Sequence, residues 1–270
     1  PNPSGSASPT LKQLLIDAAA SVEHPDDDGG SLLARWNPPD SGRDEPAIGN
    51  LGGGSDHVGF YTHLGIPSMW PGMGGASLYH SGYDDFAFYE RFCDPDFAYG
   101  PAVARLNGLL ALRLANADVL PYALARYPTD LATHVADLRK LAEANHRLAD
   151  WSELDQAITG LDQAVSDWDV ARADLIDSED DRRLPAVNEA LLGLEKAFLA
   201  EGGLQNRPWS RSLYATPDPF SGYASWMLPG LRYEVLEGGA DSLAHWMSTY
   251  ADAVNELTAR VAALTELAAL

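Results

Sequence analysis

Tyr79 and His80 stand next to each other at the head of an acidic, aromatic segment, and their side chains suit zinc chemistry. A neutral imidazole is a common zinc ligand, and a neighbouring phenol can donate a hydrogen bond to an oxyanion. Taken alone, His80 is more often a structural or surface residue than a ligand, so the rest of the sequence must decide between these roles.

Two further segments stand out in the sequence. The run from Gly52 to Gly54 leads through Ser55 and Asp56 into a helical pattern, and its glycines permit close backbone approach. A strand-to-helix turn also takes glycine for steric reasons alone. No Gly-Lys-Ser/Thr sequence follows, so the run is not a phosphate-binding loop. Tyr223, in a later loop, offers another phenol.

The remaining metal-binding residue types do not complete a zinc site. No two of the other histidines are paired on one helix face, and we expect structural or surface roles for His24, His57, His63, His134, His146 and His245. Cys93 is the single cysteine, which excludes an internal disulfide. Its aromatic neighbours predict a buried helix face.

The composition is that of a globular protein with one large domain or two ordinary ones. The chain has 270 residues, of which 46% are hydrophobic, enough for a sizeable core. Its formal net charge of -21 repels phosphate backbones and anionic lipids, which argues against nucleic acid and membrane contact by this region. No run of eighteen apolar residues occurs.

Short elements must position the glycine run and the Tyr79–His80 pair. The sequence predicts a helix over 11–22, brief strands over 47–50 and 66–70, and a helix over 56–64 with Ser55 as its N-cap. These elements form an α/β fragment with too few strands for a sheet of its own. The first helix follows the start directly, as if the chain were entered partway through a domain.

Beyond Pro101 the pattern changes to long helices. Apolar residues recur at three- and four-residue steps over 103–114, 131–141, 154–165, 187–198 and 243–264. These stripes predict a bundle. The segment from Gly202 to Tyr233 reads as a loop of about thirty residues, and loops of this length are usually functional.

In this order the motifs resemble the C-terminal part of the glutamate carboxypeptidase II-like zinc peptidase family. The resemblance extends from about Leu11 to Leu267, and its most specific motif is Leu78-Tyr79-His80-Ser81. The other matching motifs are the glycine run, Phe92 to Tyr99, Ala115 to Pro121, the helices, and Tyr214 to Gly230.

The resemblance implies a fold, a cofactor and partners. Residues 1–118 are expected to form the C-terminal part of a zinc peptidase α/β domain. Residues 119–270 are expected to form a helical, four-helix-bundle-like dimerisation domain of the transferrin-receptor type, with a substrate-site loop at 202–233. The complete enzyme would hold two zinc ions, act on a peptide and form a homodimer, with the upstream part of the same peptidase as a partner. An extracytoplasmic location, secreted or periplasmic, is favoured.

The resemblance also implies roles for single residues. His80 would be the last protein ligand of the zinc pair, and the hydroxyl of Tyr79 would steady the tetrahedral intermediate. The backbone carbonyl of Gly54 would accept the substrate amide, and Ser55 would line the substrate site. Asp56 belongs to the same turn, in a role left open. The phenol of Tyr223 would bind the terminal carboxylate of the substrate.

Three departures from the family pattern affect these expectations. Gly222 stands where the glutamate-preferring enzyme has Lys, and no Arg lies between Trp70 and Ala76, so a less acidic substrate is expected. The family's other zinc ligands and its catalytic Glu lie upstream of the matched region. A catalytic zinc takes about three protein ligands, so His80 alone cannot hold the metals.

Three functions remain open on the sequence. The leading hypothesis is part of a zinc-dependent exopeptidase, a carboxypeptidase or an aminopeptidase, that hydrolyses peptide bonds with zinc-activated water. The alternative is a catalytically silent, receptor-like dimeric scaffold, against which the retention of Tyr79 and His80 argues. A free-standing helical dimerisation module is the third.

Overall fold

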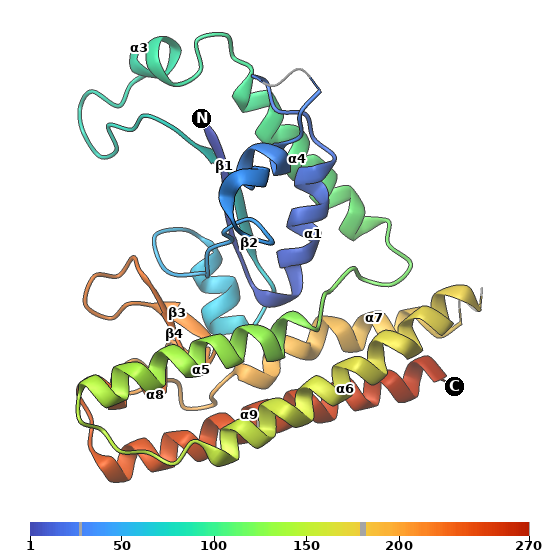
Figure 1. Ribbon diagram of the computed structural model, residues 1–270, viewed down its shortest axis with the longest axis vertical. Helices are drawn as coiled ribbons and strands as arrows, with labels where there is room; N and C mark the ends of the chain where they lie inside the picture. The colour runs from blue at the N-terminus through green and yellow to red at the C-terminus, as the bar shows by residue number, and fades with distance from the viewer. Residues whose placement is uncertain (27–28, 179–181, 270) are drawn as a thin grey trace. The chain divides into compact units, whose positions relative to one another are not determined.

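A computed structural model describes residues 1–26, 29–178 and 182–269. Most of these residues are helical, and the strands are few and short (Figure 1). The chain divides into two compact units: unit 1 comprises residues 1–49 and 69–117, and unit 2 comprises residues 50–68 and those from Asp118 onward. The expected peptidase portion, 1–118, thus contains a segment, 50–68, that lies in unit 2.

Unit 1 is built on a two-stranded antiparallel sheet. Strand β1 (Asn2–Ala7) pairs with β2 (Met69–Gly74) along its whole length, with Asn2 opposite Gly74 and Ala7 opposite Met69. Helices α1 (Pro9–Ala20), α2 (Leu32–Trp36) and α4 (Tyr99–Ala115) contact these strands. The shorter helices are η1 (Pro39–Ser41), α3 (Phe86–Phe88) and the π-helix η3 (Tyr89–Cys93).

The core of unit 1 confirms the first predicted helix. Helix α1 buries Leu11, Leu14 and Leu15 on one face, as the three- and four-residue spacing requires. A Cβ atom at Gly5 of β1 would lie 2.8 Å from Leu15 Cδ2. Glycine in this strand therefore permits close approach of the helix to the sheet.

The strand predictions for this unit were largely wrong. Strand β1 was missed, residues 47–50 contribute only an isolated bridge between Gly49 and Ser6, and the strand expected over 66–70 begins at Met69. The residues of β1 are small or turn-forming and carry no strong strand propensity, so pairing with β2 determines their conformation.

The aromatic stretch around Cys93 was also misread as a buried helix face. Phe92 is 66% exposed, Tyr89 is exposed and Cys93 is only partly buried. The helical turns here are too short to align these rings on one face, and the local hydrogen bonding is of the π type.

Unit 2 is mainly helical, as predicted. Its main helices are α5 (Arg126–Ala144), α6 (Ser152–Asp177), α7 (Leu184–Gly193), α8 (Pro229–Leu236) and α9 (Ala240–Ala269), with the 3-10 helix η4 (Leu194–Phe198) after α7. Helices α6 and α9 lie side by side over much of their length (Figure 1). The predicted apolar stripe of α9 is buried throughout: Leu243, Met247, Tyr250, Val254, Leu257, Val261 and Leu264.

Two shorter parts of unit 2 carry substrate-binding candidates. Residues 57–64 are helical, with a π-helix η2 at Gly59–His63, which agrees with the helix predicted over 56–64. The segment 202–233 was wrongly read as a loop without secondary structure. It contains an antiparallel hairpin of β3 (Ala215–Pro217) and β4 (Ser225–Met227) and the start of α8.

Candidate functional site

The glycine turn, residues 52–54, lies directly against the loop that carries Tyr223. The Gly53 N–H donates to the Tyr223 carbonyl at 2.8 Å. A Cβ at Gly53 would lie 1.8 Å from the Gly222 carbonyl oxygen. A Cβ at Gly52 would lie 2.7 Å from the backbone carbonyl oxygen of Tyr223. Only glycine allows the two backbones to approach this closely.

Gly54 places the turn against the ring of Tyr223. Its φ of +80° is in the left-handed region, and a Cβ there would lie 2.8 Å from Tyr223 Cδ1. Tyr223 remains 57% exposed. The structure thus brings together two of the predicted substrate-binding residues, Gly54 and Tyr223, within unit 2.

Ser55 and Asp56 follow the turn on the surface. Both are exposed, and their backbone carbonyls accept hydrogen bonds from Val58 and Gly59 at the start of the helix. His57, whose role was expected to be structural, contacts the Gly52 carbonyl through Nε2 at 3.1 Å. The imidazole of His57 thereby supports the glycine turn.

Tyr79 and His80 form a stacked pair in unit 1. Their ring centroids are 3.8 Å apart, and the tyrosine is 63% exposed. The backbone of His80 has a φ of 60°, a left-handed conformation that costs a non-glycine residue about 1–2 kcal/mol. Other non-glycine residues, among them His146 and Leu228, share a positive φ, so this conformation does not by itself assign a role to His80. The six candidate residues therefore form two groups, one in each unit.

The segment after this pair is anchored by Asp94. This buried carboxylate accepts the N–H groups of Ala98, Tyr99 and Gly100 at the start of α4, together with the Tyr89 hydroxyl at 3.0 Å. Burial alone would raise the pKa of Asp94, but these four donors hold it below its ordinary value. The carboxylate is therefore ionised near neutral pH.

The sequence reading missed Asp218 and Ser221, which organise the loop around Tyr223. The Asp218 carboxylate accepts the Phe220 N–H at 2.8 Å and the Ser221 hydroxyl at 2.9 Å. The Phe220 N–H, then Ser221 and the charge of Arg207 lower the pKa of Asp218 below its usual range. The signal was present in the Asp-Pro pair at 218–219, because such a pair favours turn initiation, and a nearby Ser can stabilise the turn through its hydroxyl.

The described residues do not form a complete zinc site. Within 1–26, 29–178 and 182–269, no three His, Cys, Asp or Glu side chains are arranged to hold a metal ion. The exposed imidazole of His80 fits the role of one ligand, and a catalytic zinc needs about three. A zinc site that included His80 would therefore need ligands from outside the described residues.

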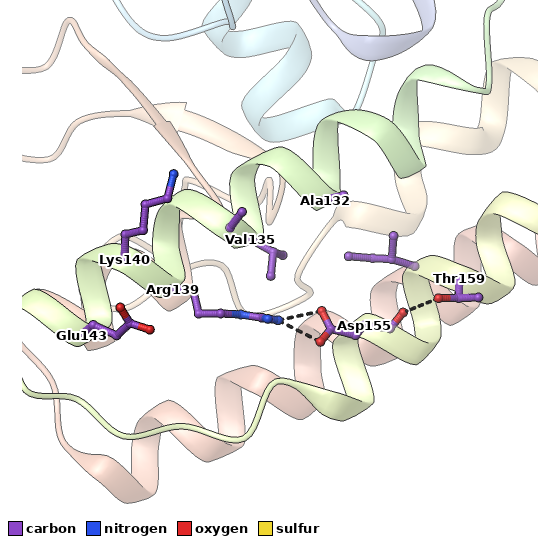
Figure 2. A pocket seen from close by; sticks show the side chains of 9 residues that line it. Ala132, Val135, Arg139, Lys140, Glu143, Asp155 and Thr159 are labelled. Atoms are coloured by element: carbon purple, nitrogen blue, oxygen red, sulfur yellow. Dashed lines mark hydrogen bonds and ion pairs between the residues drawn. The ribbon is translucent and has the colours of Figure 1, made fainter.

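A groove between α5 and α6 offers about 430 Å³ (Figure 2). Arg139 on α5 points to Asp155 on α6 and donates to both carboxylate oxygens at 2.8 Å. The apolar side chains of Val135 and Ile158 also line the groove. This ion pair is about half exposed, so it contributes at most about 1 kcal/mol. None of the six candidate residues lines the groove.

The described helices include none with both the length and the apolar character needed to cross a membrane.

Comparison with known proteins identifies relatives of most of the chain and a family model for its helical part. Residues 141–262 match the family model described as the transferrin receptor-like dimerisation domain. A probable glutamate carboxypeptidase of Arabidopsis thaliana is 33% identical over 228 residues, which cover 84% of this chain and 32% of that protein. A probable glutamate carboxypeptidase of Zea mays is 30% identical over 235 residues, 83% of this chain and 32% of that protein.

A relative with a different activity in its name is an aminopeptidase of Mus musculus, 29% identical over 252 residues, which cover 80% of this chain and 32% of that protein. The chain therefore spans about a third of the length of the curated relatives it matches.

Proposed function

Because this chain belongs to the glutamate carboxypeptidase-like peptidase family and corresponds to its C-terminal part, we propose that it forms one wall of the active site and the dimerisation domain of a zinc-dependent exopeptidase. Its first α/β elements would be the C-terminal piece of the peptidase domain. The observation that carries the proposal is the contact between the glycine turn and Tyr223, because two predicted substrate-binding residues far apart in sequence meet there.

In this proposal, Tyr79 and His80 act at the reacting bond. Zinc, when bound, supplies a Lewis acid that makes water nucleophilic near neutral pH. His80 supplies one ligand through its exposed imidazole, and further polypeptide of the same peptidase supplies the others and the general base. The Tyr79 hydroxyl donates a hydrogen bond to the oxyanion that develops on the substrate carbonyl.

The second group, in unit 2, binds the substrate. The Gly54 carbonyl accepts an N–H of the peptide, and Ser55 and Asp56 line the same surface. The Tyr223 phenol donates to the terminal carboxylate, and its exposed position beside Gly54 suits this role.

The substrate is proposed to be less acidic than a C-terminal glutamate. Gly222, not a lysine, precedes Tyr223, and no arginine lies between Trp70 and Ala76. With a net charge of -21 on the chain, nothing at these positions attracts a second carboxylate. Some named relatives are carboxypeptidases and one is an aminopeptidase, so both classes of exopeptidase belong in the substrate screen.

The proposed assembly is a homodimer formed through the helical domain, in an extracytoplasmic location. The match of residues 141–262 to a dimerisation domain supports the oligomeric state.

The test is metal content and peptidase activity of this chain, first alone and then joined to its natural upstream sequence. We expect zinc and activity only in the longer form. Tyr79→Phe should lower kcat by about 10²–10³ without loss of zinc, because it removes an oxyanion donor. His80→Ala should remove both zinc and activity.

The matched control is Tyr83→Phe, which changes another exposed tyrosine four residues away and should leave kcat within about twofold of the unmodified protein. A longer form that is inert and free of zinc even when zinc is supplied would support the receptor-like scaffold instead. Tight binding of two zinc ions by the short chain alone would contradict the role given to His80.

A further inference from the structure

The loop that carries Tyr223, residues 218–224, is held together by its own side chains. It connects β3 to β4 and is closed by the Asp218 N–H on the Ala224 carbonyl and by the Gly222 N–H on the Asp218 carbonyl, both at 2.8 Å. At its base, Arg207 Nη1 donates to the Pro217 carbonyl at 3.0 Å. The loop is therefore held by its own backbone hydrogen bonds and by the side chain of Arg207.

Ser221 connects the Asp218 carboxylate to the backbone of Tyr223 through two hydrogen bonds. The Ser221 hydroxyl donates its proton to Asp218 Oδ2 at 2.9 Å, which leaves the lone pairs of Ser221 Oγ free to accept. The Tyr223 N–H lies 3.3 Å from this oxygen and the Ala224 N–H lies 3.5 Å from it. An ionised acceptor strengthens the first link of such a chain.

The backbone of Tyr223 is consequently fixed on both sides. Its N–H meets Ser221 Oγ, and its carbonyl accepts the Gly53 N–H at 2.8 Å. Tyr223 is more than half exposed, and its ring lies against the backbone of Gly54. The direction of the phenol therefore depends on the orientation of its backbone.

We propose that Asp218 and Ser221 are positioning residues for the Tyr223 phenol, holding it over the glycine turn so that it can meet the substrate's terminal carboxylate. This inference rests on the proposed function. In this chain Gly222 carries no side chain that could share the carboxylate, so the geometry of the Tyr223 phenol matters more for the proposed recognition.

The hydrogen bonds that link Asp218, Ser221 and the Tyr223 N–H form a brace for Tyr223. The charge on Asp218 keeps this brace in place near neutral pH. Its carboxyl has a pKa below the ordinary value of 3.8, and the cations Arg207 and Arg232 both interact with it electrostatically. A carboxyl whose pKa is lowered in the folded protein stabilises the fold at any pH above its pKa in the unfolded chain. This stabilisation is lost as the pH falls through its pKa in the folded protein. The brace therefore persists at neutral pH and is lost only below about 3.8.

The test compares Ser221→Ala, Ser221→Thr and Asp218→Asn in the full-length protein with peptide substrates. Ser221→Ala and Asp218→Asn should raise KM about tenfold with kcat within about twofold, because uniform binding of the carboxylate is weakened. Ser221→Thr keeps the hydroxyl and should retain the original KM. Ser225→Ala is the matched control, since the buried Ser225 hydroxyl in β4 has no hydrogen-bond partner among the described residues.

A double-mutant cycle separates positioning from a general structural effect. In a Tyr223→Phe background, Ser221→Ala should raise KM no further, because the hydroxyl that the brace aims is gone. An equal rise of KM in both backgrounds, or no rise in either, would overturn the proposal.

A second readout does not depend on activity. With 3-fluorotyrosine incorporated, the ¹⁹F resonance of Tyr223, assigned by its loss in Tyr223→Phe, should shift or broaden in Ser221→Ala and Asp218→Asn but not in Ser225→Ala. If the unmodified protein shows no peptidase activity and the resonance still responds, the proposed function fails while the positioning role stands. A resonance unchanged in both variants overturns the positioning role.

Discussion

At the scale of single residues, the candidate site depends on the absence of side chains at the glycine turn. Gly52 and Gly53 let one backbone pass against another, and Gly54 adopts a left-handed conformation beneath the Tyr223 ring. The glycine run thus meets a steric requirement of the turn and also places Gly54 beside Tyr223. The steric and the functional explanation of the run are therefore compatible. A steric requirement at this point is what brings the phenol to the turn.

Gly53→Ala tests this contact. Its Cβ would lie 1.8 Å from the Gly222 carbonyl oxygen, so the turn or the Tyr223 loop must shift. We expect the free energy of unfolding to fall by about 1–3 kcal/mol, measured by urea denaturation. Gly59→Ala is the control: a Cβ there meets nothing within 4 Å, and alanine favours helical backbone. Equal stability of the two variants would show that the close approach does not exist.

At the scale of elements, short and irregular segments carry the candidate chemistry and long helices support them. Tyr79 and His80 lie in a turn, and Tyr223 lies between two strands of three residues each. Such segments have little cooperative stability of their own, so side-chain anchors hold them. Asp94 at the start of α4 and Asp218 in the Tyr223 loop are two such anchors.

Asp94→Ala should destabilise the start of α4. The change leaves three backbone N–H groups and the Tyr89 hydroxyl without their acceptor, and we expect a loss of about 2–3 kcal/mol in the free energy of unfolding at pH 7. Because the pKa of Asp94 is lowered in the folded state, the difference should shrink as the pH falls below 3.8.

Urea denaturation at several pH values measures this difference. Asp96→Ala, an exposed acid two residues away, is the matched control and should change stability by less than about 0.5 kcal/mol. A pH-independent loss in Asp94→Ala would contradict the role of the carboxylate charge.

At the scale of the whole molecule, charge governs how copies of the chain meet. Each copy carries a formal net charge of -21, so two copies repel each other at low ionic strength. The match to a dimerisation domain nevertheless supports association. In the proposed homodimer, apolar contact would have to outweigh a repulsion that salt can screen.

The proposed homodimer should consequently tighten with salt. The Debye length falls from about 30 Å at 0.01 M to about 8 Å at 0.15 M salt, so the dissociation constant should fall over this range. Sedimentation equilibrium at several salt concentrations measures it. A monomer at every salt concentration, or a dimer that salt weakens, would contradict an interface limited by like-charge repulsion.

The sequence by itself determined most of the helical part of the protein. The periods of α5, α6 and α9 are visible in consecutive residues, because a helix is hydrogen-bonded locally and its apolar stripe repeats every three or four positions. The motif around Tyr79 and His80 likewise pointed to the family that the comparisons then established.

The tertiary structure alone decided where strands form and which candidates meet. Strand β1 exists because residues 2–7 find residues 69–74, and the hairpin at 215–227 has strands too short to show a period. The contact between Gly54 and Tyr223 joins residues far apart along the chain, and no local pattern encodes it. Such pairings depend on which distant backbones come within hydrogen-bonding distance, and only the folded chain determines that.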